Sequence, residues 1–285
     1  MTLVWSGLSV GAIYALVAIT FNVVYTSVGV FNFAQGAILT LGVYVAYFGV
    51  VTASLPAPLV AALAMVVCAV TGLLEARFVL LPKALGRNEL LTTVGAATAI
   101  AGAVSLIWGN DVRRVPASVS KRVLVVLGGR VLPNQLWTIG LAVLLSMAIA
   151  SWYRYTRAGL ASLAVAEDRE AARLRGIDVT RKSYEAFIVA GAIAGLAGLF
   201  VGPETFAFPE LGSSLVLIAF VSFVLGGSGS VTGGVLGGFA LGLVQQFTAR
   251  YLGVLYTNSV IFGLLLAVLI ALPSGVFGDR RTRTI

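Results

Sequence analysis

Nine long apolar runs dominate this sequence and limit the folds that it can adopt. Charged residues make up only 11% of its 285 residues, against about 25% in ordinary soluble domains, and the mean hydropathy is +1.01. A water-soluble protein of this size could not bury so much apolar surface, so lipid must cover much of it. The runs are Leu3–Tyr25, Phe33–Ala53, Ala57–Leu74, Leu90–Trp108, Leu136–Tyr153, Tyr184–Gly202, Ser213–Gly226, Val231–Ala249 and Val254–Leu272.

Most of these runs are long enough to cross a bilayer as helices, because about 20 residues at a rise of about 1.5 Å span about 30 Å. Helices are required, since lipid offers no partner to free backbone N–H and C=O groups. Little of the chain is left over for a soluble domain. We therefore predict an all-α fold, in which residues 1–285 form a single domain that is a polytopic transmembrane helical bundle.

Two interruptions in the apolar pattern stand at comparable places in the two halves of the chain. The run Ser213–Gly226 would reach only about 21 Å as a helix, and the glycine-rich residues 226–230 separate it from the next run. In the first half, residues 26–29 separate the first run from the second. Paired interruptions indicate a transport pathway at a repeat interface. We therefore predict discontinuous helices and two pseudo-symmetric halves.

Lysine and arginine residues in the connecting segments predict the orientation of the chain in the membrane. Most of them lie in the segment of about 155–183, in the connection 77–89 and in the C-terminal tail. This excess places those three segments in the cytoplasm and the N-terminus and the loop of about 109–134 outside. The net charge of +8 thus reflects topology, and nucleic acid is not an expected partner. Residues 122–132 fit a short β-hairpin with a Gly128-Gly129 turn as well as they fit a plain loop.

No pattern in the chain indicates an enzyme. It has no histidine and one cysteine, Cys68, which is interpreted as a buried small apolar residue, so no metal site is expected. No Walker-type phosphate loop is present, so any ATPase must be another chain. Glu75 is expected at the end of a run, within reach of the membrane interface, and Glu204 between two spans. The energy for any pumping is therefore expected to come from elsewhere.

Small and polar residues within the spans have two interpretations. Stripes of glycine and alanine at every fourth residue are best explained by close helix packing in lipid. The uncharged polar residues are explained by interhelical hydrogen bonds or by contact with solute, and the broken helix ends could offer free backbone dipoles to that solute. Together they suit a polar, net-neutral solute. The candidate pathway residues are Asn22, Asn32, Gln35, Gly36, Ser222, Gly226, Gly227 and Gly229.

The strongest local pattern lies in residues 164–178 of the predicted cytoplasmic loop. Helix-forming residues continue up to Gly176, a residue typical of helix C-termini, and acidic residues precede basic ones, as suits the helix dipole. The pattern predicts one short amphipathic helix, which either lies on the membrane surface or docks a cytosolic partner. The spacing Glu170-Ala171-Ala172-x3-Gly176 favours docking. The candidate coupling residues are Glu167, Asp168, Arg169, Glu170, Ala171, Ala172, Arg173 and Gly176.

At these residues the chain resembles the permeases of ATP-binding-cassette importers. Glu170-Ala-Ala-x3-Gly176 is similar to the core of the loop that couples those permeases to their ATPases, although the Ile-x-Leu-Pro element of that loop is not evident. Four segments are similar to the branched-chain amino acid permease family, in the length class of its smaller, H-type subunit. They are Ser6–Leu16, Phe31–Gly36, Ala166–Ala172 and Ala219–Gly238. The similarity runs almost end to end and weakens in Gly109–Lys121.

The resemblance implies a prokaryotic inner-membrane permease with several partners. These are a second permease subunit, two cytosolic ATPase subunits that hold ATP and Mg²⁺, and an extracytoplasmic solute-binding protein; this chain is expected to bind no cofactor. The implied solutes are branched-chain and other small neutral amino acids, short amides and urea. Two alternatives stay open at this point: a stand-alone channel for a small neutral solute such as urea, and a membrane scaffold that transports nothing.

Overall fold

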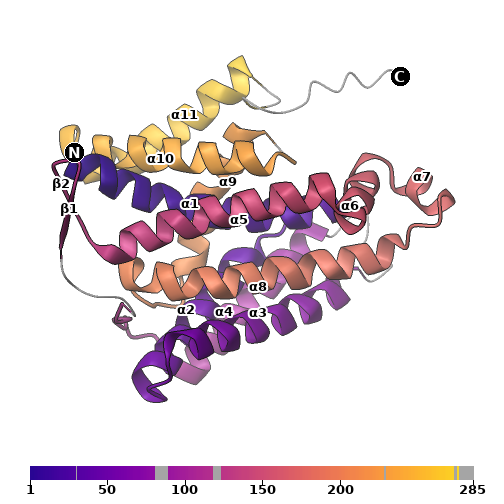
Figure 1. The fold of residues 1–285 in the computed structure, drawn as a ribbon, viewed down its shortest axis with the longest axis horizontal. Helices are drawn as coiled ribbons and strands as arrows, with labels where there is room; N and C mark the ends of the chain where they lie inside the picture. The colour runs from indigo at the N-terminus through magenta and orange to yellow at the C-terminus, as the bar shows by residue number, and fades with distance from the viewer. Residues whose placement is uncertain (30, 81–88, 118–122, 228, 273–274, 276–285) are drawn as a thin grey trace.

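A computed structural model describes residues 1–285 apart from 30, 81–88, 118–122, 228, 273–274 and 276–285, and it confirms the all-α membrane bundle (Figure 1). The helices in the described ranges are α1 (Thr2–Val28), α2 (Ala34–Tyr47), α3 (Ala57–Val79), α4 (Glu89–Trp108), α5 (Pro133–Tyr155), α6 (Arg157–Glu167), α7 (Arg169–Leu174), α8 (Val179–Thr205), α9 (Leu211–Gly226), α10 (Val231–Tyr251) and α11 (Thr257–Ala271). A π-helical segment, Phe48–Thr52, extends α2, and a 3₁₀ turn, Val254–Tyr256, precedes α11.

Seven of the described helical segments are long and apolar enough to cross a membrane. They are α1, α2 with its π-helical extension, α3, α4, α5, α8, and α11 with its preceding turn. As predicted, α9 is short. Helix α10 is 21 residues long, but it is not apolar enough to be counted with these seven. Seven of the nine predicted spans are therefore found directly, and the other two form the shorter α9 and the glycine-rich α10.

Helix α1 lies at the centre of the bundle. Of the residues in its most apolar stretch, 89% are buried. The helix packs against α10, α8, α5 and α9. A helix that is apolar on all sides is typical of such an enclosed position. By contrast, α3, α4, α5 and α11 carry large exposed apolar side chains, of which Leu106 on α4 is 90% exposed. These outer faces suit contact with lipid or with another membrane subunit.

The predicted stripes of small residues lie where helices touch. A Cβ atom on Gly242 of α10 would lie 2.2 Å from the backbone nitrogen of Gly11 on α1. One on Gly198 of α8 would lie 2.5 Å from the carbonyl carbon of Gly42 on α2. Real Cβ atoms do not approach other atoms so closely, so these contacts require glycine. Dispersion between closely packed backbones can thus hold the helices together where the hydrophobic effect is absent.

The first predicted interruption is present between α1 and α2. Gly29 has a φ of +72°, in the left-handed region that glycine adopts without strain, and its N–H donates to the carbonyl oxygen of Tyr25 at 2.7 Å. The Asn32 side-chain oxygen accepts a hydrogen bond from the N–H of Ala34 at 2.9 Å, a local turn that satisfies the first N–H of α2.

The second interruption separates α9 from α10. Gly227 and Gly229 have φ angles of +89° and +88°, which end α9. The Ser230 hydroxyl then accepts a hydrogen bond from the N–H of Gly233 at 3.1 Å and caps α10. Both breaks therefore follow the sequence prediction. The relation of the two halves as repeats stays a prediction.

A β-hairpin and helix α7 lie at opposite ends of the bundle (Figure 1). The strands β1 (Leu124–Val126) and β2 (Gly129–Val131) pair antiparallel, with Val126 opposite Gly129. The hairpin is thus confirmed, but the predicted Gly128-Gly129 turn is wrong by one residue: Leu127 and Gly128 form the turn, both with positive φ as type I′ requires. The Trp5 indole N–H donates to the carbonyl oxygen of Val126 at 3.2 Å, so the hairpin covers the start of α1.

Candidate functional site

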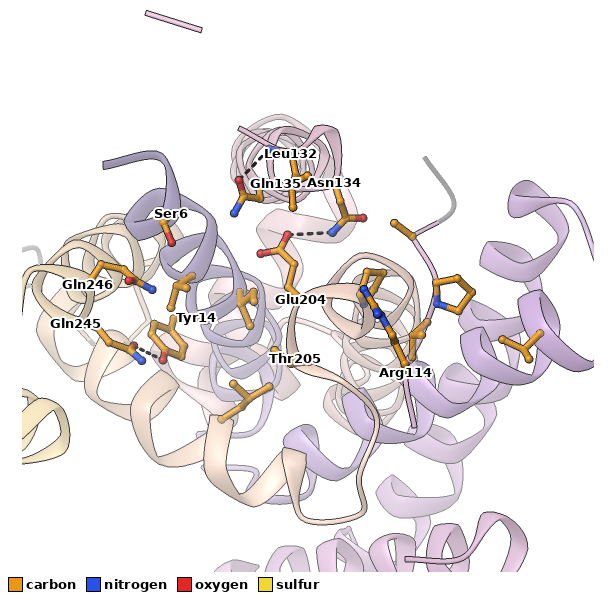
Figure 2. A pocket seen from close by; sticks show the side chains of 18 residues that line it. Ser6, Tyr14, Arg114, Leu132, Asn134, Gln135, Glu204, Thr205, Gln245 and Gln246 are labelled. Atoms are coloured by element: carbon orange, nitrogen blue, oxygen red, sulfur yellow. Dashed lines mark hydrogen bonds between the residues drawn. The ribbon is translucent and has the colours of Figure 1, made fainter. Parts of the chain in front are cut away.

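A cavity of about 900 Å³ opens at the end of the bundle that carries the hairpin (Figure 2). One part of its wall is apolar, with Val10 and Ile13 from α1 and Leu215 from α9. The other part is polar, with groups from α5, α8 and α10, and Arg114 lines it from the loop of about 109–134. The cavity thus offers both aliphatic surface and fixed polar groups, a combination typical of small-molecule sites.

Glu204 lies at the centre of the polar wall. Its Oε1 atom accepts hydrogen bonds from the Asn134 amide at 3.0 Å and the Thr138 hydroxyl at 2.9 Å, both on α5. Its Oε2 atom accepts one from the Ser9 hydroxyl on α1. The cluster Ser9–Asn134–Thr138–Glu204 therefore joins α1, α5 and α8 beside the cavity. Figure 2 shows the Glu204 carboxylate directed toward Asn134.

The prediction that Glu204 lies between two spans is wrong, because α8 continues to Thr205. The sequence interpretation ended this helix before Pro203. A proline removes one backbone donor, yet here Pro203 is inside α8, and the N–H of Phe206 still donates to the carbonyl oxygen of Gly202 at 3.0 Å. The extra turn is what brings Glu204 to α1 and α5.

Two further polar residues connect α1 and α10 along the cavity wall. The Tyr14 hydroxyl donates a hydrogen bond to the Gln245 side-chain oxygen (Figure 2). Gln246 lines the same cavity one residue further along α10. Gln245 and Gln246 already stand out in the sequence as polar residues in an apolar run, but Tyr14 and the Glu204 cluster were missed.

None of the eight predicted pathway residues lines this cavity, but three of them, Asn22, Ser222 and Gly226, lie together around Gly234 of α10. Ser222 donates to the carbonyl oxygen of Gly234 at 2.7 Å and Asn22 to that of Ala18 at 2.9 Å. Gly36 and Gly226 lie in tight backbone contacts, and Gly227 and Gly229 form the second break. Asn32 and Gln35 form a separate pair with 3.3 Å between their side chains. Their contribution to a pathway stays a prediction.

Glu75 lies about one turn before the end of α3, as predicted, and its side chain is buried inside the bundle. It is 3% exposed, and its Oε2 atom accepts a hydrogen bond from the Asn32 amide at 3.1 Å. The start of α2 covers it, because the break after α1 turns the chain back across α3. The Asn32 side chain therefore makes three hydrogen bonds: its oxygen accepts from the N–H of Ala34, and its amide donates to Gln35 and to the buried Glu75.

An aromatic cluster connects the first break with α9. The ring of Phe31 lies edge-on to Phe220 and Phe223, with centroid distances of 4.7 and 5.0 Å, and 4.7 Å from the ring of Phe21. Tyr25 adds an edge contact with Phe223 at 5.3 Å. Two residues of the cluster, Phe21 and Tyr25, follow Ile13 and Tyr14 of the cavity wall along α1. The cluster thus fills the space between α1 and α9 on the side of the cavity toward α7.

The predicted coupling helix over residues 164–178 is interrupted, so the prediction of one continuous helix is wrong. Asp168 adopts an extended conformation, with φ −154° and ψ 112°, and separates α6 from α7. Its carboxylate accepts hydrogen bonds from the N–H groups of Glu170 and Ala171 at 2.8 and 3.0 Å. Aspartate stabilises such a helix start better than a helix interior. The end of α7 agrees with the prediction, since Gly176 has a φ of +80°.

Helix α7 is anchored on one side and exposed on the other. Ala172 is buried against Val165 of α6 and Val179 of α8, whereas Leu174 is 90% exposed. Glu167, Asp168, Glu170, Arg173 and Gly176 are also exposed, and Ala171 is partly buried. The segment therefore presents an apolar side chain surrounded by charges, which suits contact with a partner protein.

Arg169 connects α7 to the transmembrane helices. One guanidinium nitrogen donates to the carbonyl oxygen of Val28, the last residue of α1, and another to the Ser183 hydroxyl on α8, each at 3.3 Å. Val28 immediately precedes the Gly29 break, and Phe31 follows it. The predicted coupling residues are thus brought together around α7, and Arg169 reaches the break that carries the aromatic cluster.

Comparisons with known proteins agree with these features. The family described as "Branched-chain amino acid transport system / permease component" matches residues 3–270. The high-affinity branched-chain amino acid transport system permease proteins LivH of Salmonella typhimurium and BraD of Pseudomonas aeruginosa are each 29% identical to this chain, and each match covers 96% of the chain and 94% of the relative. A probable LivH of Methanocaldococcus jannaschii is 27% identical over 92% of this chain and 88% of its own.

One solved structure is similar over most of the chain. PsaBC from Streptococcus pneumoniae in complex with Fab matches with a TM-score of 0.51 and 11% identity, covering 94% of this chain and 91% of that one. At this identity the likeness concerns the fold alone.

Proposed function

This chain belongs to the family of branched-chain amino acid transport system permease components, and on that premise we propose that it imports branched-chain or other small neutral amino acids as one permease subunit of an ATP-driven transporter. It is a multi-pass inner-membrane protein, and its relatives are transport permeases, not enzymes. The match of residues 3–270 carries this proposal. Its proposed partners are a second permease subunit, two cytosolic ATPase subunits with ATP and Mg²⁺, and an extracytoplasmic solute-binding protein.

Alternating access is the proposed mechanism. The cavity beside the hairpin receives the solute from the binding protein, and the aromatic cluster around Phe31 closes the route toward the α7 end. A solute that binds equally to both states would not shift their populations, so the work must come from the partners. The loop of about 109–134 is the proposed docking site outside, and α7 the proposed docking site inside.

The contacts of α7 support a route for coupling. Closure of the ATPases moves α7, and Arg169 transmits that movement to Val28 and Ser183. A Cβ atom added at Gly29 would have no other atom within 4 Å. The chain can therefore bend at Gly29 without steric obstruction. Movement at this bend displaces Phe31 from Phe220 and Phe223 and opens the route inward.

The test of this function is uptake by the reconstituted transporter. Proteoliposomes that contain this chain, its second permease and the ATPases should accumulate leucine only with ATP and the binding protein. A stand-alone channel predicts downhill flux of leucine or urea through this chain alone, without ATP. A scaffold predicts no flux from the full complex. The first result supports the importer, and either of the other two contradicts it.

Replacing the exposed Leu174 with aspartate should weaken association with the ATPases about tenfold or more. An exposed leucine between two exposed arginines, Arg173 and Arg175, is a candidate for burial at an interface, and a carboxylate there would be desolvated by the partner. Co-purification and ATP-driven uptake should fall together. Leu174→Met, which preserves volume and apolarity, should retain both, and normal association of Leu174→Asp would contradict docking through this surface.

Replacing Phe31 with alanine should make the membrane leaky to the solute. The change removes the ring that contacts Phe21, Phe220 and Phe223 at once, so the closed state loses its central contact. We expect ATP-independent efflux of preloaded leucine, several times faster than in the unmodified transporter. Phe31→Leu should leak less, because it fills more of the space. Tight liposomes with Phe31→Ala would show that the cluster is not the inner closure.

A further inference from the structure

We propose that the Glu204 carboxylate binds the ammonium group of the transported solute, so that the permease itself selects a zwitterionic aliphatic amino acid over a neutral amide or urea. This inference rests on the proposed import function and deepens it. The family resemblance implies amino acids, short amides and urea as solutes, and the cavity chemistry distinguishes among them.

The first argument is the charge state that the surroundings of Glu204 favour. The Ser9 hydroxyl and the Asn134 amide donate to Glu204, and the Thr138 hydroxyl shares its one proton between that carboxylate and the carbonyl oxygen of Asn134. An ionised carboxylate only accepts hydrogen bonds, so these donors offset part of the cost of burying its charge. Among the described residues, no lysine or arginine forms an ion pair with Glu204. The cavity wall therefore carries an acidic group with neutral partners, which attracts a cationic group from the cavity.

The second argument is the acceptor capacity that remains. A carboxylate has about four lone-pair positions. Oε1 of Glu204 accepts two hydrogen bonds and Oε2 accepts one. At least one position is left for a donor from the cavity that Glu204 lines. An ammonium group supplies such a donor together with the opposite charge, and a charge-assisted hydrogen bond is roughly twice as strong as a neutral one.

The third argument is the rest of the cavity wall. Val10, Ile13 and Leu215 provide an aliphatic surface, and Arg114 is a cation on the wall formed by the loop of about 109–134 (Figure 2). An aliphatic amino acid carries one group for each of these features. Its ammonium suits Glu204, its carboxylate suits Arg114, and its apolar side chain suits the aliphatic surface of the wall. Urea and short amides lack both charges and the aliphatic chain, so they gain little from this wall.

The rival explanation is that Glu204 only holds α1, α5 and α8 together. Binding to the complete transporter, without the binding protein, distinguishes the two. The probes are leucine, 4-methylpentanoate, which has the same skeleton without the ammonium, and urea. Loss of one hydrogen bond to a charged group changes affinity about 10-fold to 100-fold. We therefore expect the wild-type complex to bind leucine at least tenfold more tightly than 4-methylpentanoate, and urea more weakly still.

The decisive variant is Glu204→Gln, which keeps the size of the side chain and removes its charge. It should lose the preference for leucine over 4-methylpentanoate. Gly195→Ala, which crowds α8 against Ala64 of α3 and leaves the partners of Glu204 in place, is the control for a merely destabilised bundle, and it should keep the preference even if its melting temperature falls. If Glu204→Gln does not fold, Glu204→Asp is measured instead. Its carboxylate lies one methylene further from the cavity, so the preference for leucine should fall several-fold.

Two results would overturn the inference. One is a wild-type complex that binds leucine no better than 4-methylpentanoate; the other is a preference that neither Glu204→Gln nor Glu204→Asp changes. Either can occur while ATP-driven leucine uptake by the wild-type transporter is normal, and then only the role of Glu204 fails. Absence of leucine uptake by the wild-type transporter with its binding protein would instead refute the proposed function.

Discussion

Replacing Arg169 with glutamine should stop solute uptake while the ATPases stay bound. Arg169 joins α7 to the last residue of α1 and to Ser183 of α8, whereas the side chain proposed for docking is the exposed Leu174. Glutamine is too short to reach both partners and carries no charge. Hydrogen bonds from charged groups contribute about 1.5–3 kcal/mol each, so we expect uptake to fall at least about tenfold and ATP hydrolysis to continue without transport.

Uptake and ATP hydrolysis must be measured on the same proteoliposomes to detect this uncoupling. Arg173→Gln is the matched control, because Arg173 lies on the same short helix and is exposed. It should change uptake much less. If both variants lose ATPase association equally, Arg169 belongs to the docking surface. If Arg169→Gln transports normally, movement of α7 reaches the membrane helices by another contact.

Features set by local chemistry could be predicted from the sequence. The apolar runs predict the spans because a backbone in lipid must satisfy its own hydrogen bonds. The breaks near Gly29 and Gly227 could be predicted because glycine favours positive φ, and the stripe through Gly242 because only small residues let helices approach in lipid. Each of these signals lies within about one helix length of chain, so no tertiary information is needed.

The polar sites could not be predicted, because they depend on contacts between distant segments. Ser9 and Glu204 are 195 residues apart in sequence, and Asn32 and Glu75 are 43 apart. Each carboxylate alone resembles an interfacial charge at the end of a span, and only the packed bundle supplies its donors. The break at Asp168 could not be predicted for a local reason. The neighbours of Asp168 are good helix formers, but its own carboxylate caps the next helix.

Adding a single methyl group at Gly242 should disrupt the whole bundle. In Gly242→Ala the new Cβ atom would lie 2.2 Å from the nitrogen and 2.3 Å from the Cα of Gly11, and 2.4 Å from the carbonyl oxygen of Gly7. These are backbone atoms of the central helix, so relief requires α1 and α10 to separate. Overpacking of a tight interior typically costs about 1–3 kcal/mol, and a shift of two helix backbones places this variant at the upper end or beyond.

Gly140→Ala on α5 is the matched control for this prediction. No atom lies within 4 Å of a Cβ built there, and alanine is favoured over glycine in a helix by about 0.8–1.0 kcal/mol. The control should therefore melt at the same temperature as the unmodified permease or higher, while Gly242→Ala should melt much lower and accumulate poorly in the membrane. Both variants make the same chemical change in a transmembrane helix, so a difference between them isolates the α1–α10 contact. Equal stability of the two would mean that α1 and α10 are further apart than this packing requires.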